Sequence, residues 1–345
     1  MNNRNQTLDI AKGMLIILVV LGHSIQYGYG YTYCTTGQFF DNLIFRCIYT
    51  FHMPLFMAIS GFLFHYTNKR TYKEILTTRF SSIGLPFISY CTLLYIIWYN
   101  LNNIPHFYFS NYFLKLRGEM WFLSSLLLNC IIVSSITHLF QKNIKIGYVI
   151  LWCLFPLTFI ISDNYIPALH KYMYFYFLLG FVIKECSAKI PLFFLGGGSK
   201  WVFILLTCLT IICCFNYEKT IFIYNAGFCI YENGTIDYNK LYVNILRYII
   251  GVSTSCWFMR IVFFIKSHTK TLIPFLTHIG QETLGIYGFQ SIIFMTLSTI
   301  ATIKDININM GIAPLPLCVI TLLACEIAIR VCKLNRYTKK LLLGK

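Results

Sequence analysis

Three ionisable side chains share one apolar stretch near the start of the chain. Lys12 and His23 are eleven residues apart, and Asp9 lies one turn before Lys12. In a helix, eleven residues make about three turns, so Lys12 and His23 share a face at a separation of roughly 16 Å. Histidine titrates near neutral pH and suits a general base for a hydroxyl proton. A snorkelling lysine and a histidine bonded to a backbone carbonyl would explain the same spacing.

A second histidine lies at a matching depth in the next apolar stretch. His52 is twelve residues from the end of that stretch near Phe64, which is roughly 18 Å of helix. His23 is a similar distance from the start of its own helix. Because polar groups in a membrane are expensive, this coincidence favours a shared site over two separate structural histidines. Pro54 removes a backbone hydrogen bond after His52, where a kink could open a cavity.

Four further polar or aromatic side chains are weaker candidates. Arg79 begins the third apolar stretch, where an ordinary basic anchor would look the same. Glu119 precedes Trp121 at the outer end of the fourth stretch, and Trp121 alone would fit an aromatic belt. Gln290 follows a glycine-containing segment that helix packing alone could explain. We assign Glu119, Trp121 and Gln290 to substrate binding.

The elements that must position these residues are membrane helices. The 345 residues are 57% hydrophobic and 12% charged, with a mean hydropathy of +0.65, which is too apolar for a soluble domain. Apolar runs near the length of a bilayer span indicate an all-α polytopic membrane protein with a single domain over residues 1–345. We predict about ten spans, near 8–28, 38–64, 79–101, 118–139, 145–162, 168–185, 199–216, 241–265, 274–300 and 311–331.

The formal charge of +16 indicates how the protein is oriented in the membrane, and it does not indicate a nucleic-acid partner. If both termini are cytosolic, 20 of the 28 Lys and Arg residues fall on the cytosolic side. This distribution obeys the positive-inside rule at every loop. It predicts a multi-pass protein of the cytoplasmic membrane, with the lipid bilayer as its partner and no nucleic acid. The polar segment 217–240, with Glu218, Glu232 and Asp237, is then extracytoplasmic. The 14 cysteines include no spacing typical of a zinc site, and we expect no metal.

Taken in order, these motifs resemble those of the acyltransferase-3 family, particularly its fucose 4-O-acetylase-like branch. Its first helix has an Asp, a basic residue followed by Gly, and a His eleven positions after the basic residue, matched here by Asp9, Lys12-Gly13 and His23. The segment from Phe51 to Phe56 is similar to the second-helix motif. Ser60-Gly61-Phe62 completes that motif, and Arg79 to Pro86 is similar to the family's basic helix start that ends in Pro. Trp121-Phe122-Leu123 and Gly280 to Tyr287 are similar to later landmarks.

The resemblance implies O-acylation, most often acetylation, of a sugar in a surface polysaccharide or its lipid-linked precursor. Acyl-CoA is then a donor substrate from the cytosol, and no cofactor is bound permanently. Lys12, Arg79 and Asp9 would form the cytosolic mouth for the donor, with the two cations suited to its phosphates. His23 and His52 would be the catalytic pair at the end of the pantetheine arm.

Three positions depart from the family pattern. Lys12 stands where Arg is commoner, so a bidentate phosphate contact becomes a point charge. Ser82 replaces a second Arg, and Gln290 stands where many relatives have His, which excludes proton transfer at that position.

Two other classes of function remain open. A transporter or flippase for a lipid-linked glycan would also line its path with sparse polar residues. Against it, the sequence shows no inverted repeat and no pair of broken helices in corresponding halves. A non-enzymatic scaffold would leave the two histidines at one depth unexplained.

Overall fold

The chain forms two compact units, each assembled from separate parts of the sequence. The computed structural model describes residues 5–28, 38–102, 108–185, 200–232, 234–303 and 314–345. Unit 1 contains Met1–Phe45, Phe80–Leu123 and Thr269–Lys345, and unit 2 contains Arg46–Arg79 and Ser124–His268. The chain therefore passes from one unit to the other several times, and neither unit is one continuous stretch of the sequence.

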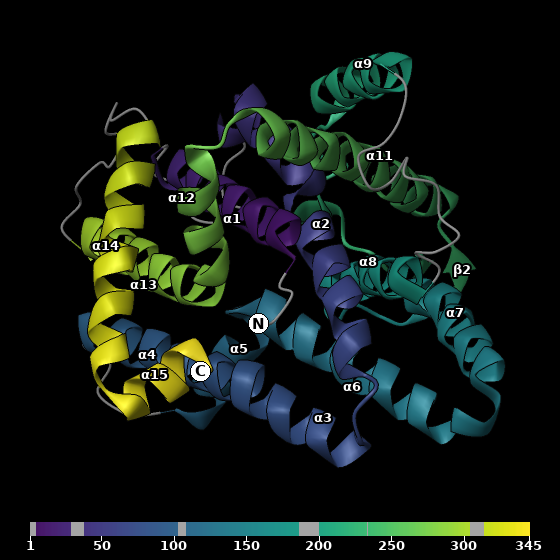
Figure 1. Cartoon of the computed structure of the whole chain (residues 1–345), viewed down its shortest axis with the longest axis horizontal. Helices are drawn as coiled ribbons and strands as arrows, with labels where there is room; N and C mark the ends of the chain where they lie inside the picture. Colours follow the sequence, from purple (N-terminus) through teal and green to yellow (C-terminus); the bar gives the residue numbers. More distant parts are fainter. Residues whose placement is uncertain (1–4, 29–37, 103–107, 186–199, 233, 304–313) are drawn as a thin grey trace. The chain divides into compact units, whose positions relative to one another are not determined.

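Unit 1 is built around the first helix and the C-terminal helices (Figure 1). Helix α1 packs mainly against α12 and α14, and α13 packs against α4 and α14. The helical elements of this unit are α1 (Gln6–Gly28), η1 (Gln38–Asp41), η2 (Phe80–Gly84), α4 (Leu85–Leu101), α5 (Phe109–Gly118), α12 (Leu272–Gln281), α13 (Thr283–Ile303), α14 (Pro314–Leu334) and α15 (Arg336–Leu343).

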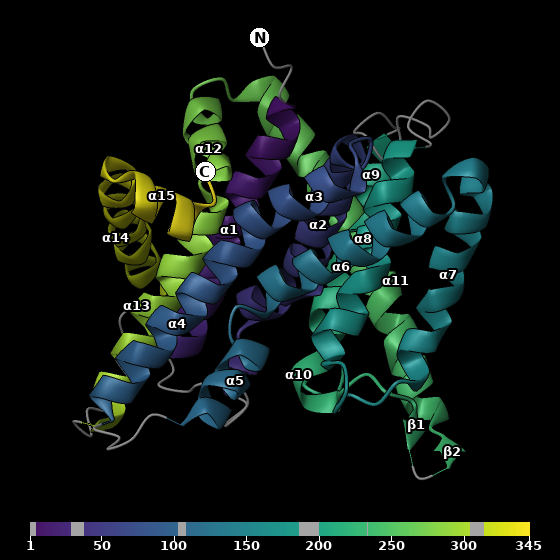
Figure 2. The ribbon, with the colours of Figure 1, turned by 90° about the horizontal axis from the view of Figure 1, so that it is seen from below.

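Unit 2 holds the central part of the chain, and its strands form a short hairpin at the ends of α7 and α11 (Figure 2). The hairpin is antiparallel, with Tyr231 opposite Ile236. The elements of this unit are α2 (Leu43–Thr67), α3 (Tyr72–Arg79), α6 (Trp121–Leu139), η3 (Gln141–Asn143), α7 (Ile144–Ile160), α8 (Ala168–Glu185), α9 (Lys200–Asn216), α10 (Ile223–Ala226), β1 (Tyr231–Glu232), β2 (Thr235–Ile236) and α11 (Tyr238–His268). The first residues of α2 and α6 belong to unit 1.

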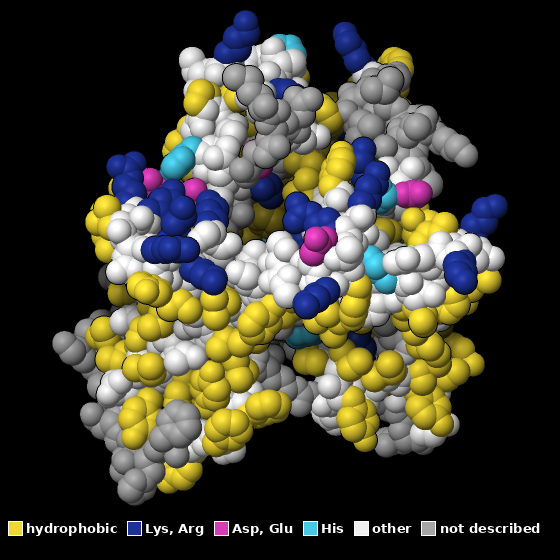
Figure 3. All heavy atoms as spheres, turned by 60° about the horizontal axis from the view of Figure 1, so that its bottom comes forward, with side chains coloured by type: hydrophobic (Ala, Val, Ile, Leu, Met, Phe, Trp, Pro, Cys, Tyr) yellow, Lys and Arg dark blue, Asp and Glu magenta, His cyan; other side chains and the backbone are white. Residues whose placement is uncertain are grey.

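The helices confirm a polytopic membrane protein. Among the described residues, eight helical segments are long and apolar enough to cross a bilayer. Large apolar side chains point outward from them, and Val149 and Leu323 are 61% and 60% exposed. On the face shown in Figure 3, dark blue Lys and Arg side chains gather over one part and yellow hydrophobic side chains cover another. An apolar belt with a basic end is the pattern of a membrane helix bundle.

The other two predicted spans are α8 and α9, which form helices but fall outside those eight segments. Helix α9 has only 17 residues. Helix α8 carries Lys171 and Lys184 but is mostly buried against protein, so it needs less apolar character than a helix facing lipid. Gly61 of α2 and Gly180 of α8 face each other where these helices cross, and a Cβ at either would overlap the backbone of the other helix.

A similar glycine crossing fixes the start of α1 in unit 1. Gly13 faces Gly280 of α12, so that a Cβ at Gly280 would overlap the carbonyl oxygen of Asp9 and a Cβ at Gly13 would overlap that of Leu276. Small residues let two backbones approach this closely in a membrane. The glycines of the Lys12-Gly13 and Gly280 motifs are therefore packing residues, and they place Asp9 against α12.

We expect Gly280→Ala to destabilise the protein by about 2 kcal/mol, because backbone and not a flexible side chain opposes the new methyl group. Thermal unfolding of purified protein in detergent measures the effect. Gly118→Ala is the matched control, since nothing lies within 4 Å of a Cβ built there. Equal melting temperatures for the two variants would contradict the close crossing.

The predicted span 274–300 is wrong in one respect, because it is two helices. Helix α12 ends at Gln281 and α13 begins at Thr283. Between them, the buried Glu282 carboxylate receives Lys333 Nζ and Lys345 Nζ, each at 3.0 Å. The carboxylate thus ties the break to α14 and to the residue that follows α15.

Candidate active site

The start of α1 carries a buried ion pair. Lys12 Nζ lies 2.9 Å from Asp9 Oδ1, and the Asp9 side chain is 4% exposed whereas that of Lys12 is 17% exposed. The Gly13–Gly280 crossing holds the backbone of Asp9 against α12. The predicted proximity of Asp9 and Lys12 is confirmed. An ammonium group has three N–H donors, so a lysine can bind a carboxylate and an anionic ligand together.

Beyond the crossing, Glu282 shapes the charge of the same region of unit 1. One carboxylate therefore faces the ammonium groups of Lys333 and Lys345. Together with Lys12 and Asp9, these five groups carry one excess positive charge, which favours an anionic ligand.

His23 lies further along α1, against an aromatic side chain of α13. Its ring stacks on Phe294 with centroids 6.0 Å apart, and Tyr27 stacks on the same Phe294 at 4.9 Å. The His23 side chain is half-buried, whereas Phe294 is fully buried. The stack fixes the plane of the imidazole without enclosing it, as a general base that meets a substrate requires.

Two buried amides flank this stack. Gln290 lies one turn before Phe294 on α13, and Gln26 lies one turn after His23 on α1. Neither glutamine is more than 1% exposed, and no amide nitrogen or oxygen of either has a hydrogen-bond partner among the described residues. Buried amides are almost always bonded, so these two have capacity for a polar substrate. Sequence reasoning found Gln290 but missed Gln26, although its spacing from His23 was visible.

Glu119 and Trp121 lie at the strained junction between α5 and α6. Met120 between them adopts a left-handed conformation with φ of 50°, which is uncommon for a non-glycine residue and is held by burial of its side chain. The next residue, Phe122, meets Tyr287 of α13 edge-on at 6.0 Å. The junction thus joins the start of α6 to the helix that carries Gln290.

His52 is buried in the middle of α2, which continues unbroken through Pro54. Its Nδ1 lies 2.7 Å from the carbonyl oxygen of Ile48, and its ring meets Tyr49 edge-on. Because a carbonyl oxygen only accepts, Nδ1 carries the proton and Nε2 keeps its lone pair. A histidine in this tautomer accepts a hydrogen bond or a proton through Nε2.

Arg79 ends α3, where the chain passes through a five-residue π-helical segment, Phe80–Gly84. The guanidinium covers the ring of Phe64 at 5.1 Å, and Nη2 donates to Thr67 Oγ1 at 2.5 Å. Its Nε is buried and has no partner among the described residues. Such π-helical turns often mark functional sites.

The structure therefore brings six of the predicted site residues into unit 1 and two into unit 2. Unit 1 holds Asp9, Lys12, His23, Glu119, Trp121 and Gln290, and unit 2 holds His52 and Arg79. The pairing of His23 with His52, and of Lys12 with Arg79, joins residues of different units and stays a prediction.

Comparison with known proteins decides the family. Residues 5–331 match the acyltransferase-3 family model, described as an acyltransferase domain. The chain is 28% identical to the nodulation protein NolL of Mesorhizobium japonicum, over 87% of this chain and 79% of that protein. It is 32% identical to the nodulation protein NolL of Sinorhizobium fredii, over 85% of this chain and 79% of that protein. No solved structure matches.

The chain belongs to the acyltransferase-3 family. The family predicted from the sequence motifs is thus confirmed, and the protein is a multi-pass membrane enzyme of an acyltransferase family.

This acyltransferase also contains a charged cluster that sequence reasoning missed, between α7 and α8. Lys171 is 2% exposed, and its Nζ lies 2.6 Å from Asp163 Oδ1 and donates to the carbonyl of Ile161. Asp163 Oδ2 accepts the backbone N–H groups of Phe228 at 2.8 Å and Cys229 at 3.3 Å. The Asp163–Lys171 pair thereby fixes the loop that precedes the hairpin.

Arg247 of α11 anchors the same loop from the other side. It is 2% exposed, and its guanidinium donates to the carbonyls of Ile221 at 2.5 Å and Gly227 at 2.8 Å and to Asn244 Oδ1 at 2.5 Å. The sequence placed Arg247 within a span without a role. The sequence predicted the segment 217–240 only as a polar loop. The contacts of Arg247 show that part of this segment is anchored to α11 within unit 2.

Proposed function

We propose that this acyltransferase transfers an acyl group, most often acetyl, from cytosolic acyl-CoA to a hydroxyl of a carbohydrate. The acceptor is a surface polysaccharide or its lipid-linked precursor, as the resemblance to the fucose 4-O-acetylase-like branch implies. The chain works as one domain in the cytoplasmic membrane, with ten spans, both termini cytosolic and residues 217–240 extracytoplasmic. The uneven distribution of basic residues supports this topology.

The observation that carries the proposal is the position of His23 on α1. It lies eleven residues beyond the Asp9–Lys12 pair, which is roughly 16 Å of helix, and beside two buried amides with unfilled hydrogen-bonding capacity. A donor whose phosphates meet Lys12 can extend its thioester along α1 to His23. His23 then removes the proton of the acceptor hydroxyl as its oxygen attacks the thioester carbonyl, and CoA leaves as the thiol.

The remaining candidates support this reaction. His52, with its lone pair on Nε2, either orients His23 or takes part in proton transfer. Gln290 and Gln26 hold hydroxyl groups of the acceptor, and Glu119 and Trp121 line its approach. Aromatic side chains with sparse polar groups are suited to binding a sugar ring.

The experiment is acyl transfer by the purified chain in detergent, with radiolabelled acetyl-CoA and an extract of lipid-linked glycans. Acceptor labelling, or slow acetyl-CoA hydrolysis without acceptor, supports the proposal. A flippase would do neither and would move the glycan across vesicle membranes without acylating it. That result would replace the proposed activity.

Removing either cation that is predicted to bind the phosphates of acyl-CoA should weaken binding of the donor without slowing the acyl-transfer step. We expect Lys12→Ala and Arg79→Ala each to raise the KM for acetyl-CoA about tenfold, the effect of one charge-assisted hydrogen bond, with kcat nearly unchanged. Lys12→Arg should be tolerated, because Arg offers more donors to a phosphate. Steady-state kinetics at matched membrane expression measures this. An unchanged KM in both alanine variants would contradict the assignment of Lys12 and Arg79 to the cytosolic binding site of the donor.

A further inference from the structure

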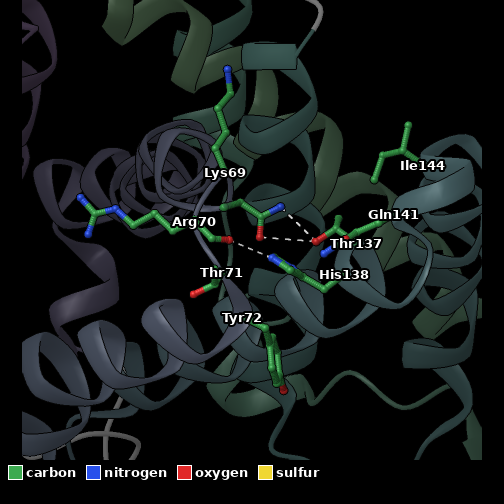
Figure 4. Close-up of a pocket in the computed structure, with 9 residues that line it drawn as sticks. Lys69, Arg70, Thr71, Tyr72, Thr137, His138, Gln141 and Ile144 are labelled. Carbon is green, nitrogen blue, oxygen red and sulfur yellow. Dashed lines mark hydrogen bonds between the residues drawn. The ribbon is translucent and has the colours of Figure 1, made fainter.

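A pocket of about 550 Å³ lies where the turn between α2 and α3 meets the end of α6 and the start of α7 (Figure 4). All of its lining residues belong to unit 2. Its volume is within the range of small-molecule sites. None of the residues predicted from the sequence as site residues lines it.

The walls of the pocket are held in place by bonds between the turn and α6. Asn68 Nδ2 donates to Thr137 Oγ1 at 3.0 Å, and Tyr72 bonds Ser135 through its hydroxyl at 3.0 Å. Thr71 and Glu74 cap the start of α3 through each other's backbone N–H groups. The turn is therefore preorganised, which lowers the entropy lost on binding.

His138 links α6 to the turn at this wall. Its Nδ1 lies 2.8 Å from the carbonyl oxygen of Ser134 and its Nε2 lies 2.9 Å from that of Arg70, as Figure 4 shows for the second contact. Carbonyl oxygens only accept, so the ring donates at least one of these bonds, and the two contacts hold it between α6 and the turn.

The charge of the lining selects an anion. Lys69 and Arg70 line the pocket and no carboxylate does. The side chains of Lys69 and Arg70 both extend away from His138 (Figure 4). The flexible four-carbon stem of Lys69 lets its ammonium turn toward a bound ligand. Gln141 and Asn68 add amide groups. A cation beside neutral donors is the chemistry of a phosphate site.

The pocket adjoins a residue already assigned to the donor. Arg79 Nη2 donates to Thr67, the residue directly before Asn68, and α3 connects the pocket to Arg79 over about 10 Å of helix. On the proposed topology the turn faces the cytosol, where acyl-CoA is found.

We propose that this pocket binds the phosphate monoester on the ribose of acyl-CoA, the 3′-phosphate, through Lys69. The inference rests on the proposed function for the identity of the donor. A monoester carries close to two negative charges at neutral pH, which suits the ammonium of Lys69 in the lining of the pocket. An anionic phospholipid headgroup offers the same phosphate-ester chemistry from another source.

The test is binding of adenosine 3′,5′-bisphosphate and adenosine 5′-monophosphate to the purified full chain, measured by isothermal titration calorimetry. We expect the bisphosphate to bind roughly tenfold more tightly, the effect of one charge-assisted contact. Lys69→Gln should abolish this preference and leave binding of the monophosphate unchanged. Lys73→Gln is the matched control, since Lys73 is exposed on the same segment and does not line the pocket.

Each other outcome overturns the assignment. Equal affinities for the two nucleotides in the wild type, or a preference that survives Lys69→Gln, would exclude the 3′-phosphate from the pocket. An equal loss in Lys73→Gln would show a general effect of positive charge. Displacement of the bisphosphate by short-chain phosphatidylglycerol but not by acetyl-CoA would assign the pocket to lipid. Because binding needs no turnover, normal binding without acyl transfer would count against the proposed function alone.

Discussion

Replacement of His23 by alanine is expected to abolish acyl transfer while acetyl-CoA still binds. The imidazole stacks on Phe294 with its centroid 6.0 Å away, and no other histidine of the described part of unit 1 lies on α1 or α13. Loss of a general base lowers turnover by about 10²-fold or more. Donor binding should persist, because the Asp9–Lys12 pair lies about three turns away.

The measurement is acylation of the glycan by mass spectrometry, at matched membrane expression, together with donor binding by calorimetry. His268→Ala is the control, since His268 is exposed and stacks on Phe264 at the end of α11. Acylation near the wild-type level in His23→Ala would end the catalytic assignment of this residue.

His52 is the second histidine that the proposed acyl transfer uses, and its role can be tested separately. His52→Ala should lower turnover by roughly 10²-fold or more if its imidazole assists transfer. His52→Gln keeps a side-chain donor, so it should lose less than His52→Ala if the role is electrostatic and about as much if His52 transfers a proton. Full activity in both variants would reduce His52 to a structural residue bonded to Ile48.

Replacement of Asp163 by asparagine is expected to loosen the 217–240 segment and to destabilise the protein by about 3 kcal/mol, because it leaves the buried Lys171 ammonium without its counter-ion. The Lys171 side chain is 1% exposed, so water cannot replace the carboxylate. The asparagine would also present weaker acceptors to the N–H groups of Phe228 and Cys229.

The same carboxylate makes the loop sensitive to acid. Burial alone would raise the pKa of Asp163, but hydrogen bonds from Lys171 and from the backbone of Phe228 and Cys229 hold the pKa below its usual value. A lowered folded-state pKa stabilises the fold above the unfolded value, about 3.9. This stability is lost as the pH falls from there through the folded-state pKa. The contribution is thus complete at neutral pH.

Hydrogen exchange of the peptide containing Phe228 and Cys229 measures the loosening at neutral pH, and thermal unfolding between pH 7 and pH 3 measures the acid effect. Asp163→Asn should exchange faster and lose the part of the acid dependence that Asp163 provides. Glu218→Gln is the control, because Glu218 is an exposed carboxylate of the same segment. Unchanged exchange in Asp163→Asn would contradict the anchoring role of the pair.

The sequence by itself determined the features that depend on local composition and period. Apolar runs of bilayer length located most of the long helices to within a few residues, because one span must satisfy its backbone internally and be apolar along its length. The predicted span 168–185, for example, is α8. Motif spacing identified the family and placed Asp9 beside Lys12, since a three-residue separation on a helix is a contact.

The tertiary structure decided what depends on residues far apart in the chain. The break at Glu282 could not be predicted from an apolar run, because Lys333 and Lys345 stabilise it from more than fifty residues away. Asp163, Lys171 and Arg247 looked like scattered charges until folding joined them to backbone groups of residues 221–229. The pocket beside Lys69 exists only where the α2–α3 turn meets α6. Such sites depend on packing between helices, and a linear pattern of residue types does not encode the partner of a buried charge.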